Sequence, residues 1–84
     1  MKQATNNVSR VIRTYRNPKT GAGRDLRYTA SRGMVSRSQV AGADDPEGHA
    51  FCFGQDVETC RRIWREVEAG LLADGFEIVG TKAR

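Results

Sequence analysis

The fold is decided by residues 56–75, DVETCRRIWREVEAGLLADG, in the second half of the sequence. Apolar side chains recur in this segment at intervals of three and four residues, and on a helix they fall within an arc of about 120°. The stripe consists of Val57, Cys60, Ile63, Trp64, Val67 and Leu71. A single apolar face predicts an amphipathic helix that packs on one side against a core.

Both ends of this helix are marked in the sequence. Asp56 is a residue type that caps helix N-termini, and Glu58 places a negative charge in the first turn. Glu58 and Arg62 form a favourable pair four residues apart. Gly75 predicts the end of the helix, because glycine adopts the left-handed conformation that terminates many helices.

Two segments before the helix predict a β-hairpin. Residues 8–16 are rich in β-forming side chains, and residues 26–30 alternate between apolar and polar. Residues 17–23 contain Asn-Pro and two glycines, which predicts the hairpin loop. The apolar side of the second segment is made of Leu26, Tyr28 and Ala30, and the polar side of Arg27 and Thr29.

Further strands are expected on both sides of the helix. After a turn at 31–33, residues 34–40 predict a weaker third strand, and either Met34 and Val40 or Val35 point inward. Residues 41–49 form a small, acidic loop broken by glycine and proline. Two short apolar segments complete the pattern: 50–53, and 76–80 with Phe76 and Ile78 inward.

These elements predict an α+β fold. We expect a small antiparallel β-sheet of three to five strands with one helix from the second half of the chain packed on one face, in the order β-β-β-(β)-α-β. Eighty-four residues make a single small domain, 1–84. Residues 1–7 and 81–84 are expected to be frayed tails.

Composition places the chain among soluble folding proteins. The hydrophobic fraction is 38% and the charged fraction 29%. The apolar runs are too short to span a membrane, and the residues behind Lys2 lack the apolar stretch of a secretory signal. The sequence therefore predicts a cytoplasmic protein without membrane contact.

The two cysteines are predicted to pack as apolar side chains, and the sequence indicates no metal or cofactor. Cys52 and Cys60 are too few for a disulfide framework, and in a reducing compartment free cysteine packs as a small hydrophobic residue. His49 adds a third candidate zinc ligand at an unfamiliar spacing, but a structural zinc site needs four.

Residues for catalysis are also missing. The single histidine lies in a loop, and no serine has the Gly-x-Ser-x-Gly context of a nucleophile. The loop 19–24 has glycines and bases but lacks the spacing of a nucleotide-binding P-loop. The sequence predicts a protein that is not an enzyme.

Charge is distributed unevenly along the chain. Residues 1–40 hold nine basic residues and one acid, a net charge of +8, whereas residues 41–84 have a net charge of −4. Seven of the nine basic residues are arginines, which favour bidentate contacts with phosphate or guanine. This asymmetry points to a polyanionic partner, most often nucleic acid.

A candidate interface follows if Ile12 faces the helix. The opposite side of the sheet then carries side chains of the first three strands that can bind phosphate or base edges, and the 17–24 loop adds further cations. The predicted nucleic-acid-binding residues are Arg13, Tyr15, Lys19, Arg24, Arg27, Arg37 and Gln39. Whether the nucleic acid is DNA or RNA stays open.

A second function fits the same composition. The basic half could bind an acidic surface on a protein partner, as in a small plasmid- or phage-type inhibitor or adaptor. A short sheet with an open edge also leaves a homodimer open.

Overall fold

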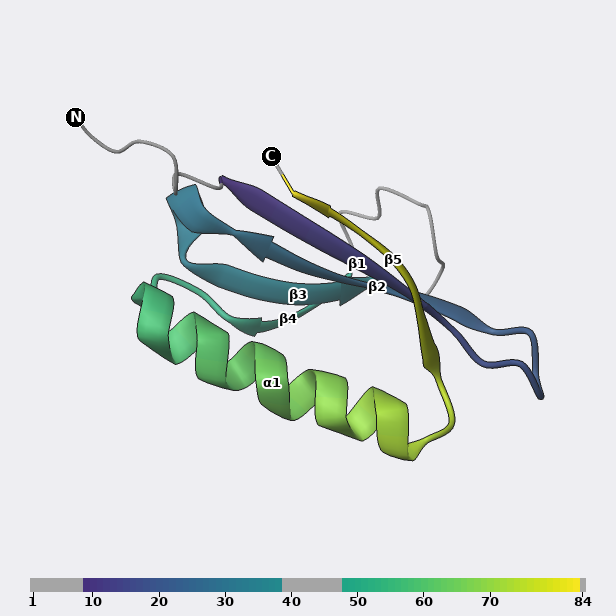
Figure 1. Ribbon diagram of the computed structural model, residues 1–84. Helices are drawn as coiled ribbons and strands as arrows, with labels where there is room; N and C mark the ends of the chain where they lie inside the picture. The colour runs from purple at the N-terminus through teal and green to yellow at the C-terminus, as the bar shows by residue number, and fades with distance from the viewer. Residues whose placement is uncertain (1–8, 39–47, 84) are drawn as a thin grey trace.

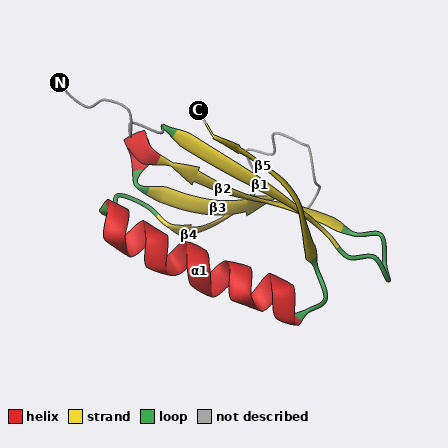
Figure 2. Cartoon of the chain, viewed as in Figure 1, coloured by secondary structure: helices red, strands yellow, loops and turns green. Residues whose placement is uncertain are grey.

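A five-stranded sheet forms one layer of the molecule and a single helix the other. In the computed structural model, which describes residues 9–38 and 48–83, the helix lies along one face of the sheet (Figure 1). The sheet order is β4-β3-β2-β1-β5, and every neighbouring pair is antiparallel (Figure 2). The predicted α+β class and element order are confirmed.

The bounds of the elements differ from the predicted ones by a few residues. They are β1 (Arg10–Arg16), β2 (Gly23–Thr29), a 3-10 turn (Ala30–Arg32), β3 (Met34–Ser38), β4 (His49–Cys52), α1 (Val57–Ala73) and β5 (Glu77–Ala83). Most of the predicted loop 41–49 and all of the tail 1–7 lie outside the described residues.

Helix α1 begins and ends as its sequence indicates. The Asp56 carboxylate accepts a hydrogen bond of 2.8 Å from the backbone N–H of Thr59. Hydrogen bonds from Thr59 also hold the pKa of Asp56 below its ordinary value. Gly75 has a φ of 95°, and the N–H groups of Gly75 and Phe76 donate to the carbonyls of Leu72 and Leu71. These two bonds form the Schellman motif, which turns the chain from α1 into β5.

The core lies between α1 and the middle strands. Its buried apolar side chains are Tyr15, Leu26, Val35, Cys60, Leu71 and Phe76. Val35 is fully buried, so the inward side of the third strand is settled in favour of this residue. Ile63, Trp64 and Val67 of the predicted stripe pack against this core, whereas Val57 is 54% exposed at the start of the helix.

The helix does not cover the whole sheet. It packs mainly on β2, β3 and β4, and every residue of the edge strand β5 is exposed. Ile78, predicted to point inward, is 47% exposed because its strand lies beyond the reach of α1. The predicted frayed tail is also corrected, because Thr81, Lys82 and Ala83 continue β5 and pair with β1.

Candidate nucleic-acid interface

Strand register divides the predicted interface residues between two faces. Directly opposed residues of antiparallel strands point to the same side of the sheet. Arg13 lies opposite Leu26, and Leu26 lies opposite Arg37, so all three point toward the helix side with the buried core. Arg27 lies opposite Ile12, on the side that α1 does not cover, which we call the open face. The predicted interface required Ile12 to face the helix, and this condition is not met.

Arg13 and Tyr15 both contact the helix. Both donate to the same Glu68 carboxylate oxygen, Arg13 over 2.7 Å and the Tyr15 hydroxyl over 2.6 Å. Arg13 Nε also donates to the Thr81 hydroxyl at 2.9 Å, which links β1 to β5. These contacts hold helix α1, strand β1 and the edge strand β5 together.

The ionisation of this cluster follows from its contacts. Burial alone would raise the pKa of Glu68, but the hydrogen bonds from Tyr15 and Arg13 outweigh it, so the pKa lies below its ordinary value. Burial, followed by the hydrogen bond to Glu68, raises the pKa of Tyr15. At neutral pH the cluster is a carboxylate held by a guanidinium and a neutral phenol.

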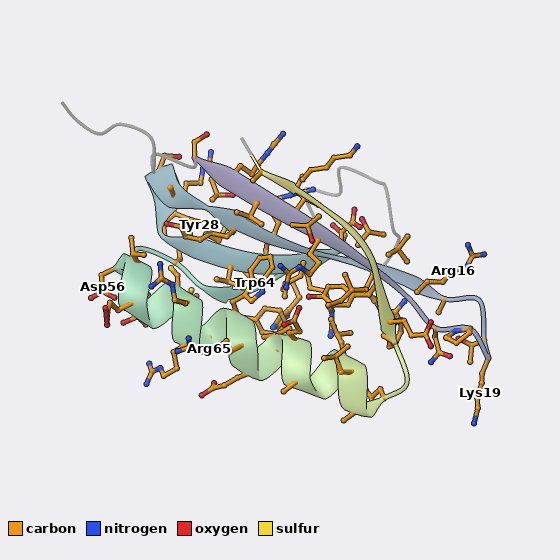
Figure 3. The ribbon with its side chains drawn as sticks, in the orientation of Figure 1. Arg16, Lys19, Tyr28, Asp56, Trp64 and Arg65 are labelled. Atoms are coloured by element: carbon orange, nitrogen blue, oxygen red, sulfur yellow. The ribbon has the colours of Figure 1, made fainter. Side chains whose placement is uncertain are left out.

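Three of the predicted arginines lie over aromatic rings. The guanidinium carbons of Arg13, Arg24 and Arg37 lie 5.6, 5.2 and 5.6 Å from ring centroids. The corresponding rings belong to Trp64, Phe76 and Phe51. Figure 3 shows Trp64 between helix and sheet. These cation–π contacts stabilise the packing of the helix side.

The open face gathers other cations. Ile12 of β1 lies between Arg27 of β2 and Lys82 of β5, and Arg10 lies two residues from Ile12 on the same side. We call Arg10, Arg27 and Lys82 the basic patch. Arg32, in the exposed 3-10 turn that follows β2, lies at the same end of the sheet.

The opposite end of the open face is more acidic. Asp25 lies opposite Thr14, whose hydroxyl donates to it at 2.8 Å, and only 3% of Asp25 is exposed. Glu77 lies opposite Arg16 at the same end. The face is therefore polarised along its strands, with cations in excess around Ile12.

The β1–β2 hairpin loop is held by Asn17. Its side chain accepts a hydrogen bond from the Lys19 N–H at 2.9 Å and donates one to the Asp74 carbonyl at 3.2 Å. Gly21, with a φ of 77°, completes the turn, and its N–H donates to the Asn17 carbonyl. Lys19 is exposed at the tip of this loop, away from the helix (Figure 3).

The structure thus separates the seven predicted residues into four groups. Arg13, Tyr15, Arg24 and Arg37 lie on the helix side, Arg27 on the open face and Lys19 at the hairpin tip, while Gln39 falls outside the described residues. Arg10 and Lys82 were missed. They could have been found from the alternation of strand side chains between two faces, if Tyr15 instead of Ile12 had been assigned to the core.

Comparison with known proteins identifies no relative. No protein-family model matches the chain, and neither the curated proteins nor the solved structures give a match. Within residues 9–38 and 48–83, no three histidine, cysteine or carboxylate residues gather as a metal site would require. The same residues include no helix with the length and apolarity needed to cross a membrane.

Proposed function

We propose that this protein is a small nucleic-acid-binding domain that contacts its ligand through the open face. The observation that carries the proposal is the basic patch, in which three neighbouring strands each place one cation around Ile12 on the side of the sheet opposite α1. This proposal keeps the expected class of ligand and moves the interface to other residues.

The dimensions of the patch suit a phosphate backbone. Neighbouring strands lie about 4.8 Å apart, so the Cα atoms of Arg27 and Lys82, one strand on either side of Ile12, are roughly 10 Å apart. Arginine binds a phosphate oxygen pair with two parallel N–H groups, and lysine contributes a point charge. Ile12 supplies an apolar surface for a sugar or a base between them.

The remaining charges of the open face favour binding of a polyanion at one end of it. Glu77 at the other end of this face repels phosphates, so a polyanion is drawn toward Arg10 and Lys82. Arg13 and Tyr15 are excluded from this interface because their polar atoms are bound to Glu68 on the other side of the sheet.

The test compares two triple variants with the same change in net charge. Replacing the basic patch (Arg10→Gln, Arg27→Gln, Lys82→Gln) should flatten the slope of log K against log salt by about 2–3 units, because each phosphate contact contributes roughly 0.9. The measurement is fluorescence anisotropy with short DNA and RNA duplexes and single strands at several salt concentrations.

The control replaces Arg61, Arg62 and Arg65, which are exposed on α1; Arg65 points away from the sheet in Figure 3. This variant should keep the wild-type slope. Thermal unfolding checks that each variant is folded, and the double variant Arg10→Gln, Lys82→Gln serves if the triple variant is not. Equal losses in both triples would place the interface elsewhere, and a wild type without salt-sensitive binding would refute the function.

The alternative function, a module that binds a protein partner, is favoured by one observation. The edge strand β5 exposes Ile78 by 47% and Val79 by 64%. An edge strand with exposed apolar side chains can pair with a strand of another protein. Replacing Val79 with Lys should abolish binding of such a partner, whereas it should leave nucleic-acid binding at the basic patch intact.

A further inference from the structure

Two cysteines from different elements meet at one end of the helix. Cys52 is the last residue of β4, and Cys60 lies in the first turn of α1. Their Sγ atoms are 3.9 Å apart, and both thiols are free. From the sequence alone, the two cysteines were predicted only to pack as small hydrophobic residues. The sequence does not indicate that β4 brings Cys52 against the helix.

The backbone around the pair is fixed by hydrogen bonds. The N–H of Gly54 donates to the Arg32 carbonyl at 2.8 Å, and the N–H of Gln55 donates to the Gly33 carbonyl at 3.1 Å. The two thiols lie against this frame, with Cys52 Sγ 3.7 Å from the Gly33 carbonyl oxygen and Cys60 Sγ 3.8 Å from that of Gln55. Both sulfurs are therefore held in place before any reaction occurs.

We propose that Cys52 and Cys60 are a thiol–disulfide exchange site, which closes to an intramolecular disulfide by reaction with a low-molecular-weight disulfide such as glutathione disulfide. A disulfide bond is about 2.05 Å long, so the sulfurs must approach by roughly 1.9 Å from their present separation. This approach requires rotation about the Cα–Cβ bonds of the two cysteines.

The exposure of the two thiols sets the order of events. Cys52 is half-buried and reachable, whereas Cys60 is 2% exposed. Cys52 first loses its proton and attacks one sulfur of glutathione disulfide, whose S–S bond breaks, and one glutathione leaves as a thiolate. Cys60 then loses its proton and attacks the Cys52 sulfur, and the second glutathione leaves. Two cysteine thiols are oxidised, and one disulfide is reduced to two glutathione thiols.

The second step has a characteristic pH dependence. Burial, together with the contact with Cys52, raises the pKa of Cys60 to about 11. Only the thiolate attacks, so the rate of the second step should rise about tenfold per pH unit between pH 7 and 10.

The test follows the mass of the protein in glutathione disulfide. The wild type should lose two hydrogens and no longer react with an alkylating reagent, and its Tm should rise by about 5 °C or more, because the new bond constrains the unfolded chain. A thiol reductant should reverse all three changes.

Single variants distinguish the roles of the two thiols. Cys60→Ser should stop at the mixed disulfide and gain one glutathione, whereas Cys52→Ser should stay unmodified in the folded state. Cys60→Ala replaces the serine variant if the buried hydroxyl unfolds the protein. The proposal is overturned if the wild type acquires two glutathiones, forms only intermolecular disulfides, or is attacked first at Cys60.

Discussion

At the scale of single residues, Glu68 is the point where helix and sheet are joined by polar contacts. One of its oxygens accepts hydrogen bonds from both Arg13 and Tyr15, which occupy alternate positions on β1. The ion pair is only partly exposed, with 28% of the Arg13 side chain and 19% of the Glu68 side chain accessible. Such a pair is screened less by solvent than a surface pair.

Tyr15→Phe should therefore destabilise the protein although it keeps the buried ring. The substitution removes one hydrogen bond to a charged acceptor, which costs about 1.5–3 kcal/mol. Urea unfolding at neutral pH measures the loss. Tyr28→Phe is the control, because Tyr28 is also partly buried against the core but has no contact with Glu68 among the hydrogen bonds described above. Equal effects of the two substitutions would show that the bond to Glu68 contributes nothing.

The lowered pKa of Glu68 makes stability depend on pH in a defined direction. The unfolded chain takes up the proton near the ordinary value of 4.5 and the folded chain only at lower pH. The contribution of Glu68 is thus complete above pH 4.5 and is lost as the pH falls through the folded value. Glu68→Gln should reduce the acid-induced loss of stability, measured as Tm from pH 7 to 3, whereas Glu66→Gln, at an exposed position on α1, should leave it unchanged.

At the scale of elements, the connection between β2 and β3 depends on one glycine. Gly33 has a φ of 56°, and a Cβ atom at this position would collide with the backbone of Gln55 in the segment before α1. The close approach allows the Gln55 N–H to donate to the Gly33 carbonyl. The helix start and the sheet can lie this near to each other only because the side chain is absent.

Gly33→Ala should be clearly more destabilising than Gly21→Ala. Both positions have a positive φ, which costs about 1–2 kcal/mol for a residue with a Cβ atom. Gly21 has open space around that atom, so its substitution measures the conformational cost alone. The difference in the free energy of unfolding, expected to exceed about 1 kcal/mol, measures the collision with Gln55. No difference would mean that this segment moves away freely.

Element types were predictable because each has a local signature. The stripe and caps of α1, and the glycine-containing loop of the hairpin, depend on residues close together in sequence. The side of β1 that faces the helix was not predictable in this way. Val11 and Ile12 are both aliphatic, so either of the two possible orientations of the strand places one of them inward. In the structure Tyr15 faces the helix and contacts Glu68, 53 positions away in the sequence. No local sequence pattern indicates this contact.

The same limit explains the candidate interface. The excess of cations in the first half of the chain could be counted in the sequence, whereas their division between two faces depends on the register of β1 with β2 and β5. A shift of one residue exchanges the faces of a strand. The basic patch also includes Lys82, which sequence alone assigned to a frayed tail.

At the scale of the whole molecule, β5 is needed to complete the sheet. Removal of residues 81–84 would take away the partners of Ile12 and Arg13 on β5 and the hydrogen bond from Arg13 to Thr81. With each net hydrogen bond contributing about 1 kcal/mol, the truncated protein should lose at least about 2 kcal/mol of stability. Thr81→Val removes only the side-chain bond and should cost less. A truncated protein with unchanged urea unfolding would show that the end of β5 does not contribute.

The position of β1 between β2 and β5 has a consequence for synthesis. Its partner on one side follows within a few residues, but the contact of Arg13 with Thr81 on the other side joins residues 68 positions apart. While the protein is being translated, the hairpin and β3 can pair early, whereas β1 keeps an unpaired edge until the segment of β5 has left the ribosome. The nascent chain therefore passes through a period in which an interior strand of the finished sheet is an edge strand, open to pairing with another nascent copy.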